Sequence, residues 1–134
     1  MKVIIDTNVF ISGIFFSGPP SQILRAWRDK KIQLAISLEI FHEYERVGEI
    51  LAGDHPGLDL KPFLDYVFLF AEFYEAPLLP ASICEDPDDD KFFACALACE
   101  SKVIISGDKH LLKVSGYQNI EVLKPREFVN RYQL

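Results

Sequence analysis

The stretch Val3-Ile4-Ile5-Asp6-Thr7-Asn8 decides the fold. Its first half is apolar and β-branched, as expected of a central parallel strand that is buried on both faces. The strand ends at Asp6, and an ionised Asp in such a place is costly unless it is paired or bound to a metal. Because open parallel sheets bind ligands beyond the carboxyl ends of their strands, we expect Asp6 in a functional site. The alternative role for Asp6 is a helix N-cap or turn acid.

A second stretch repeats this pattern near the other end of the chain. Val103-Ile104-Ile105 is again fully apolar, and Ser106-Gly107-Asp108 follows it. Parallel strands bring their carboxyl ends to one edge of the sheet, so we expect Asp108 near Asp6. Capping of a short helix from Lys109 to Lys113 would explain Asp108 equally well.

The remaining elements follow from apolar spacing and turn residues. Helices are predicted around Ile23–Trp27, from the N-cap Ser37 to about Leu51, over Leu60–Tyr74 and Lys91–Glu100, and from Pro125 onward; further strands are predicted at Ile32–Ile36 and Ile120–Leu123. Strands that alternate with helices indicate an α/β fold with a parallel sheet covered on both faces. No repeat or Gly/Ser linker interrupts the chain, so we expect one domain over residues 1–134.

The predicted Leu60–Tyr74 helix is apolar on almost every side. A helix of this kind is usually buried against partners on both faces. A second copy of the chain would supply such a partner. The alternative is a core helix inside a monomer.

Two further acids stand on helices that should meet the same sheet edge. Glu43 falls inside the apolar arc of its helix, between Val47 and Ile50, so it should face the core or a cleft. A glutamate at such a margin can also simply snorkel or pair with a base.

An acidic run, Asp86-Pro87-Asp88-Asp89-Asp90, precedes the helix at Lys91. Helix capping and the helix dipole explain one or two of these acids but not four like charges. By helical spacing Asp90 shares the packed face with Ala94, whereas Asp88 and Asp89 suit capping. A slip of one residue in this register would move the role of Asp90 to a neighbour.

Clustered carboxylates disfavour one another's ionised forms, and a bound divalent cation reverses that penalty. Ligand sets made only of oxygen favour hard ions such as Mg²⁺ or Mn²⁺. A bound cation would also moderate the net charge of −6, which is unusual for a protein that binds nucleic acid. The bases that flank the third and fourth acids could contact a phosphate backbone; they are Lys91, Lys109, His110 and Lys113.

Cysteine usage and hydropathy indicate the compartment. The three cysteines, Cys84, Cys95 and Cys99, form no CxxC pair, which argues against a disulfide framework or a structural zinc site. No signal-peptide pattern opens the chain, and no apolar run approaches the roughly 18 residues of a membrane span. We therefore expect a cytoplasmic protein without a membrane partner.

In order and spacing, these motifs resemble those of PIN-domain nucleases. The N-terminal hydrophobic-Asp6-Thr7-Asn8 resembles the first motif of that family, Ser37-x5-Glu43 the second, Asp90-x3-Ala94 the third and Ser106-Gly107-Asp108 the fourth. The resemblance covers essentially the whole chain. The most similar group contains VapC-like toxins of toxin–antitoxin pairs.

This resemblance implies a three-layer α/β/α sandwich with a central parallel sheet of about five strands. It implies a Mg²⁺- or Mn²⁺-dependent endoribonuclease that hydrolyses phosphodiester bonds in single-stranded RNA. Asp6, Glu43, Asp90 and Asp108 would then form the catalytic, metal-binding quartet, supported by Thr7, Asn8 and Ser106. Homodimers are common in the family, and a toxin would also have an antitoxin protein as its partner.

Other functions remain open at this point. A phosphatase could use Asp6 as its nucleophile, but phosphatases of the haloacid-dehalogenase type need a second Asp where Asn8 stands. A receiver-type signalling domain would need a lysine after a late strand, which Val103–Asp108 does not offer. A non-catalytic RNA- or protein-binding module on the same fold is the more serious alternative.

Overall fold

A parallel sheet of five strands forms the centre of the protein, described over residues 1–134 by a computed structural model. The strands are β1 (Lys2–Ile5), β2 (Gln33–Ile36), β3 (Glu72–Phe73), β4 (Val103–Ile105) and β5 (Glu121–Leu123), in the spatial order β3-β2-β1-β4-β5. β1 lies in the middle, where Ile5 is in register with Ile105 of β4. The first residues after β1 and β4 therefore lie side by side.

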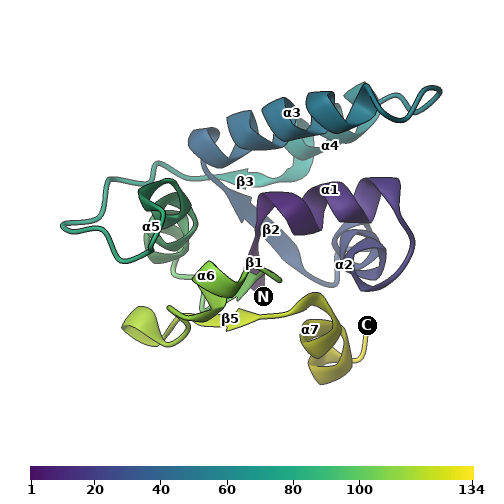
Figure 1. The fold of residues 1–134 in the computed structure, drawn as a ribbon. Helices are drawn as coiled ribbons and strands as arrows, with labels where there is room; N and C mark the ends of the chain where they lie inside the picture. The colour runs from purple at the N-terminus through teal and green to yellow at the C-terminus, as the bar shows by residue number, and fades with distance from the viewer.

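Helices cover both faces of this sheet. They are α1 (Thr7–Phe15), α2 (Pro19–Arg28), α3 (Leu38–Ala52), α4 (Lys61–Phe70), α5 (Asp90–Cys99), α6 (Lys109–Leu112) and α7 (Pro125–Tyr132), with 3₁₀ turns η1 (Pro87–Asp89) and η2 (Tyr117–Asn119). α5 packs on β1, β2 and β4, while α1 contacts α2 and α3, and α2 contacts α7. In Figure 1, α5 lies on one side of the sheet and α1, α2 and α7 on the other. The predicted three-layer α/β/α sandwich is confirmed.

The apolar strands form the middle of one contiguous hydrophobic core. Val3–Ile5 and Ile104–Ile105 are fully buried, α5 packs on both strands, and Phe92 and Phe93 of α5 belong to the same core. Burying each such side chain stabilises the fold by about 1.5–3 kcal/mol. The core thus fixes the strand ends at which the polar residues follow. No helix of the protein combines the length and the apolar character needed to cross a bilayer.

Two elements differ from the sequence-based expectation. Residues Thr7–Phe15, for which no helix was predicted, form α1 directly after β1. The helix predicted over Leu60–Tyr74 ends at Phe70, because Ala71 turns to an extended conformation and residues 72–73 pair with β2 as the edge strand β3. The prediction for the end of this helix was therefore wrong.

α4 buries much less of its surface than its composition suggests. Only Val67 of this helix is fully buried, whereas Phe68, Leu69 and Phe70 are 61%, 71% and 60% exposed. Within one chain, α4 is thus not the core helix of the monomeric alternative. Self-association through this face stays a prediction.

Candidate active site at the carboxyl edge of the sheet

Asp6 lies where β1 ends and α1 begins, and it is only 4% exposed. Its backbone N–H donates to the carbonyl oxygen of Ile105 at 3.0 Å, which holds it against β4. One carboxylate oxygen accepts the N–H of Val9 at 2.8 Å and so caps α1, while the other accepts the hydroxyl of Ser106. Asp6 therefore does act as the N-cap of α1. Capping alone, however, does not require that its side chain be buried next to the end of β4.

Burial raises the pKa of Asp6 to about 6. The hydrogen bonds from Ser106 and Val9 oppose this shift, and the negative charges of Asp108 and Asp89 add to it. The raised pKa of Asp6 thus reflects its burial first and the neighbouring carboxylates second.

Glu43 reaches the same region from α3. The hydroxyl of Tyr44 donates to the carbonyl oxygen of Ile5, and its ring stacks on Phe10 with centroids 4.1 Å apart, which anchors α3 at the end of β1. The hydroxyl of Thr7 then donates to Oε2 of Glu43. Thr7 therefore links the second acid to the residue beside the first.

Lys91, at the start of α5, neutralises part of this acidic group. Its ammonium donates to Oε1 of Glu43 and, at 3.0 Å, to Oδ2 of Asp88. The side chains of Lys91 and Glu43 are only 16% and 13% exposed. Arg46, which is mostly exposed, lies 3.8 Å from the same oxygen of Glu43.

Asp90 and Asp89, in the acidic run before α5, have different surroundings. Asp90 turns its carboxylate to the preceding loop, where it accepts the N–H of Cys84 at 2.9 Å and that of Ile83 at 3.3 Å. Burial acts to raise the pKa of Asp90, but hydrogen bonds from Ser82, Cys84 and Ile83 outweigh it and hold the pKa below its ordinary value. Its interactions are those of a residue that fixes a loop.

Asp89, the last residue of η1, is the member of this run that acts on Asp6. Burial raises the pKa of Asp89 to about 6, and the charges of Asp108, Asp86, Glu43 and Asp88 raise it further. Its side chain makes no capping hydrogen bond, although capping was expected of it. Capping falls instead to Asp86, which accepts the N–H of Asp88 at 3.0 Å. The helical spacing of α5 does not extend to Asp89, because Asp89 belongs to the 3₁₀ turn η1.

Asp108 is half-buried and both caps α6 and acts on the other acids. Its carboxylate accepts the N–H of His110 at 2.8 Å, and its own N–H donates to the hydroxyl of Ser106 at 3.0 Å. Ser106 thus connects Asp108 to Asp6. Asn8, predicted as a supporting residue, is exposed. Of the flanking bases, Lys109 and Lys113 are exposed and His110 pairs with Glu85 at 2.8 Å.

The chemistry of this group suits a hard cation, although no three acidic, His or Cys side chains stand close enough together to form a ready-made ion site. Asp6, Asp89 and Asp108 offer only carboxylate oxygens, and none of them takes part in an ion pair. Their charges are therefore uncompensated, and a divalent ion would relieve their mutual repulsion.

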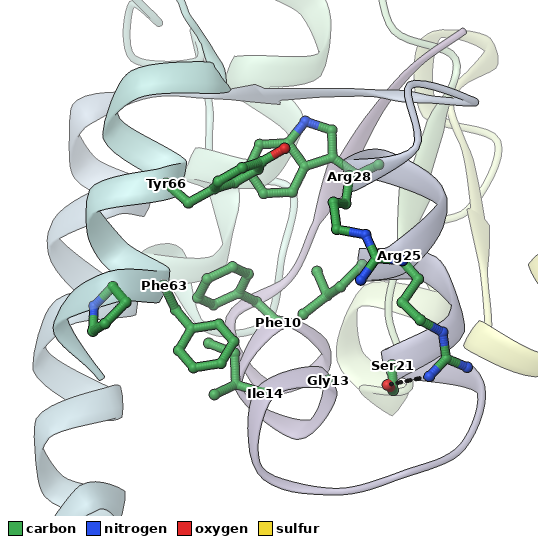
Figure 2. Close-up of a pocket in the computed structure, with 11 residues that line it drawn as sticks. Phe10, Gly13, Ile14, Ser21, Arg25, Arg28, Phe63 and Tyr66 are labelled. Atoms are coloured by element: carbon green, nitrogen blue, oxygen red, sulfur yellow. Dashed lines mark hydrogen bonds between the residues drawn. The ribbon is translucent and has the colours of Figure 1, made fainter. Parts of the chain in front are cut away.

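An apolar cavity lies elsewhere in the protein and contains none of these acids. It has a volume of about 450 Å³ and lies between α1, α2 and α4. Figure 2 shows the rings of Phe10, Phe63 and Tyr66 facing the side chains of Arg25 and Arg28 across it. A second cavity of about 450 Å³ adjoins the acidic site, with Lys91, Asp88 and Asp90 in its wall.

The sequence matches the PIN domain over residues 2–110, a range that includes all the acids described above. The chain belongs to the PIN-domain family. An uncharacterized protein from Methanocaldococcus jannaschii is 30% identical over 150 aligned residues, which cover 99% of this chain and 92% of the relative. PIN domains are in general nucleases and typically use divalent metals. The resemblance inferred from the four motifs is confirmed.

Proposed function

We propose that this PIN domain is a Mg²⁺- or Mn²⁺-dependent endoribonuclease that hydrolyses phosphodiester bonds in single-stranded RNA. The observation that carries the proposal is the buried carboxylate of Asp6 at the end of β1, which Ser106 links to Asp108 after β4. Neither of these acids nor Asp89 of η1 has a basic partner. Such a group fits a hard cation, and the family to which the chain belongs supplies the reaction class.

Within this proposal, Asp6, Asp89 and Asp108 hold the metal, and Glu43 lies beside them. When bound, the metal would lower the pKa of a water molecule and offset charge on the phosphate. Ser106 orients Asp6 and Asp108, and Thr7 orients Glu43. Asp89 takes the role first expected of Asp90, whose carboxylate is occupied by the loop amides.

The test is a degradation assay on single-stranded RNA, with single-stranded DNA and duplex RNA as comparisons. We expect cleavage of the single-stranded RNA with Mg²⁺ or Mn²⁺, none with chelator, and none for Asp6→Asn. The matched control is Asp54→Asn, which removes an exposed acid from the loop after α3 and should cleave normally. RNA binding that persists without cleavage under every metal would support the non-catalytic module instead.

The proposal extends to a toxin role with two protein partners. The exposed aromatic face of α4 offers a surface for a second copy of the chain, and the apolar cavity beside Arg25 and Arg28 offers one for an antitoxin. Induced expression should then arrest growth, and the Asp6→Asn chain should not. Normal growth while the purified protein cleaves RNA would contradict the toxin role and leave the nuclease role intact.

A further inference from the structure

Lys91 is the one basic side chain held inside the acidic site. Both it and Glu43 are largely buried, whereas the other base near Glu43, Arg46, has a side chain that is 64% exposed. The ammonium of Lys91 lies within salt-bridge distance of the carboxylates of both Glu43 and Asp88. A largely buried lysine that is paired in this way serves as a fixed cation.

The position of Lys91 divides the site into two unequal halves. In one half, Glu43 and Asp88 share the ammonium of Lys91. In the other half, Asp6, Asp89 and Asp108 have no cation at all.

Two-metal phosphodiesterase sites place their ions about 3.5–4 Å apart, with carboxylates shared between them. Here the oxygens of Glu43 that could serve a second ion are both in use, one by Thr7 and one by Lys91. A second divalent ion would have to displace a buried ammonium and then lie beside its charge, which Coulomb repulsion opposes.

Resting on the proposed nuclease function, we propose that the ammonium of Lys91 occupies the place beside Glu43 that a second cation would take. The site then accepts a single divalent ion, at Asp6, Asp89 and Asp108. Lys91 is a positioning residue in this arrangement, because its ammonium, rather than a metal ion, holds the carboxylates of Glu43 and Asp88.

The geometry also gives Lys91 a way to reach the substrate. A lysine ammonium has three N–H donors, and Glu43 and Asp88 accept two of them. The side chain forms part of the wall of the cavity next to the site. The third donor is therefore available to a phosphate oxygen of RNA that lies along that wall.

The experiment counts Mn²⁺ ions bound by the purified full chain after treatment with chelator. Isothermal titration calorimetry should give one ion per wild-type chain and two per Lys91→Met chain, because loss of the ammonium frees Glu43 and Asp88. Lys91→Arg, which keeps the charge, should bind one. The matched control is Lys61→Met, which removes an exposed lysine paired with Asp65 at 2.7 Å outside the site and should also bind one.

Electron paramagnetic resonance provides a second readout that a purely structural role of Lys91 would not change. The loaded wild-type chain should show the spectrum of isolated Mn²⁺, and Lys91→Met that of two interacting ions. If Lys91→Met does not fold, Lys91→Gln, which removes the charge but keeps hydrogen-bond donors, replaces it and should also bind two ions.

Two ions in the wild type, or a single ion in folded Lys91→Met, would overturn the inference about Lys91. RNA cleavage that depends on Asp6 would leave the nuclease function standing in either case. A wild-type chain that binds no Mn²⁺ and cleaves no RNA would overturn both proposals together.

Discussion

The buried carboxylate of Asp6 makes the stability of the metal-free protein depend on pH. Its pKa in the fold is raised from 3.8 to about 6, so the folded chain binds more protons than the unfolded chain between these values. The stabilising contribution is complete below pH 3.8 and is lost as the pH rises through about 6. For this single group the loss amounts to at most about 3 kcal/mol.

We therefore expect Asp6→Asn to gain stability relative to the wild type as the pH rises from 4 to 7. Urea unfolding in chelator at several pH values measures this difference. The comparison between the two proteins isolates Asp6, because Asp88 and Asp90 have lowered pKa values and act in the opposite sense in both. A difference that stays constant over this range would contradict the assignment of a raised pKa to Asp6.

Two neighbouring acids should give opposite phenotypes. Asp90→Ala leaves the amides of Ile83 and Cys84 without their acceptor and should destabilise the fold by about 1–3 kcal/mol, with cleavage by the folded protein retained. Asp89→Ala should lower the cleavage rate by about 100-fold or more, since even residues that only orient metal ligands contribute about 10–100-fold. Thermal unfolding and RNA cleavage are measured for both variants. Loss of cleavage in Asp90→Ala with normal cleavage by Asp89→Ala would show that Asp90, not Asp89, belongs to the site.

At the level of elements, α4 exposes three consecutive large apolar side chains. We expect the protein to be a homodimer that buries Phe68, Leu69 and Phe70, which are all more than half exposed in one chain. Leu69→Glu should yield monomers while changing the free energy of unfolding of the chain itself by no more than about 0.5 kcal/mol. Sedimentation at micromolar concentration measures this, with Lys61→Glu on the same helix as the control.

A wild-type chain that sediments as a monomer would remove the dimer from the proposed partners. It would not affect the nuclease proposal, because every acid of the site comes from one chain.

Most elements could be predicted from the sequence because their signals are local. Val3–Ile5 and Val103–Ile105 are apolar triplets of β-branched residues, and Ser37 caps α3 as expected by accepting the N–H of Ile40. The strand β3 could not be predicted in this way. It consists of two residues after an apolar helix, and pairing with β2 defines it rather than any pattern of its own.

The proposed site, like the fold, could be predicted from the sequence only in part. Asp6 and Asp108 follow from strand ends, and Ser106 lies beside Asp6 because their strands pair in register. The choice between Asp89 and Asp90 depends on the turn η1 and on a loop six to seven residues earlier in the chain. An assignment of residues to helix faces by their spacing includes neither of these features. The pairing of Lys91 with Glu43 joins residues 48 positions apart, so it required the fold.

For the whole molecule, an ion at the acidic site should act as a ligand that stabilises the fold. The chain carries 20 acidic and 14 basic side chains, and three of its acids have no compensating charge at the sheet edge. Binding to the folded state alone contributes about 2.7 kcal/mol when the ion is present at 100 times its dissociation constant. Mn²⁺ should therefore raise the melting temperature of the wild type and of Asp54→Asn, but that of Asp6→Asn much less. Equal increases in all three would place the ion elsewhere.

The strand order has a consequence for the chain as it leaves the ribosome. β1 is made first, yet one of its two neighbours, β4, is encoded about a hundred residues later. A nascent chain that stops before Val103 leaves one edge of its central strand open and lacks both Ser106 and Asp108. A chain cut before Val103 should therefore be inactive in the proposed RNA cleavage and prone to aggregate.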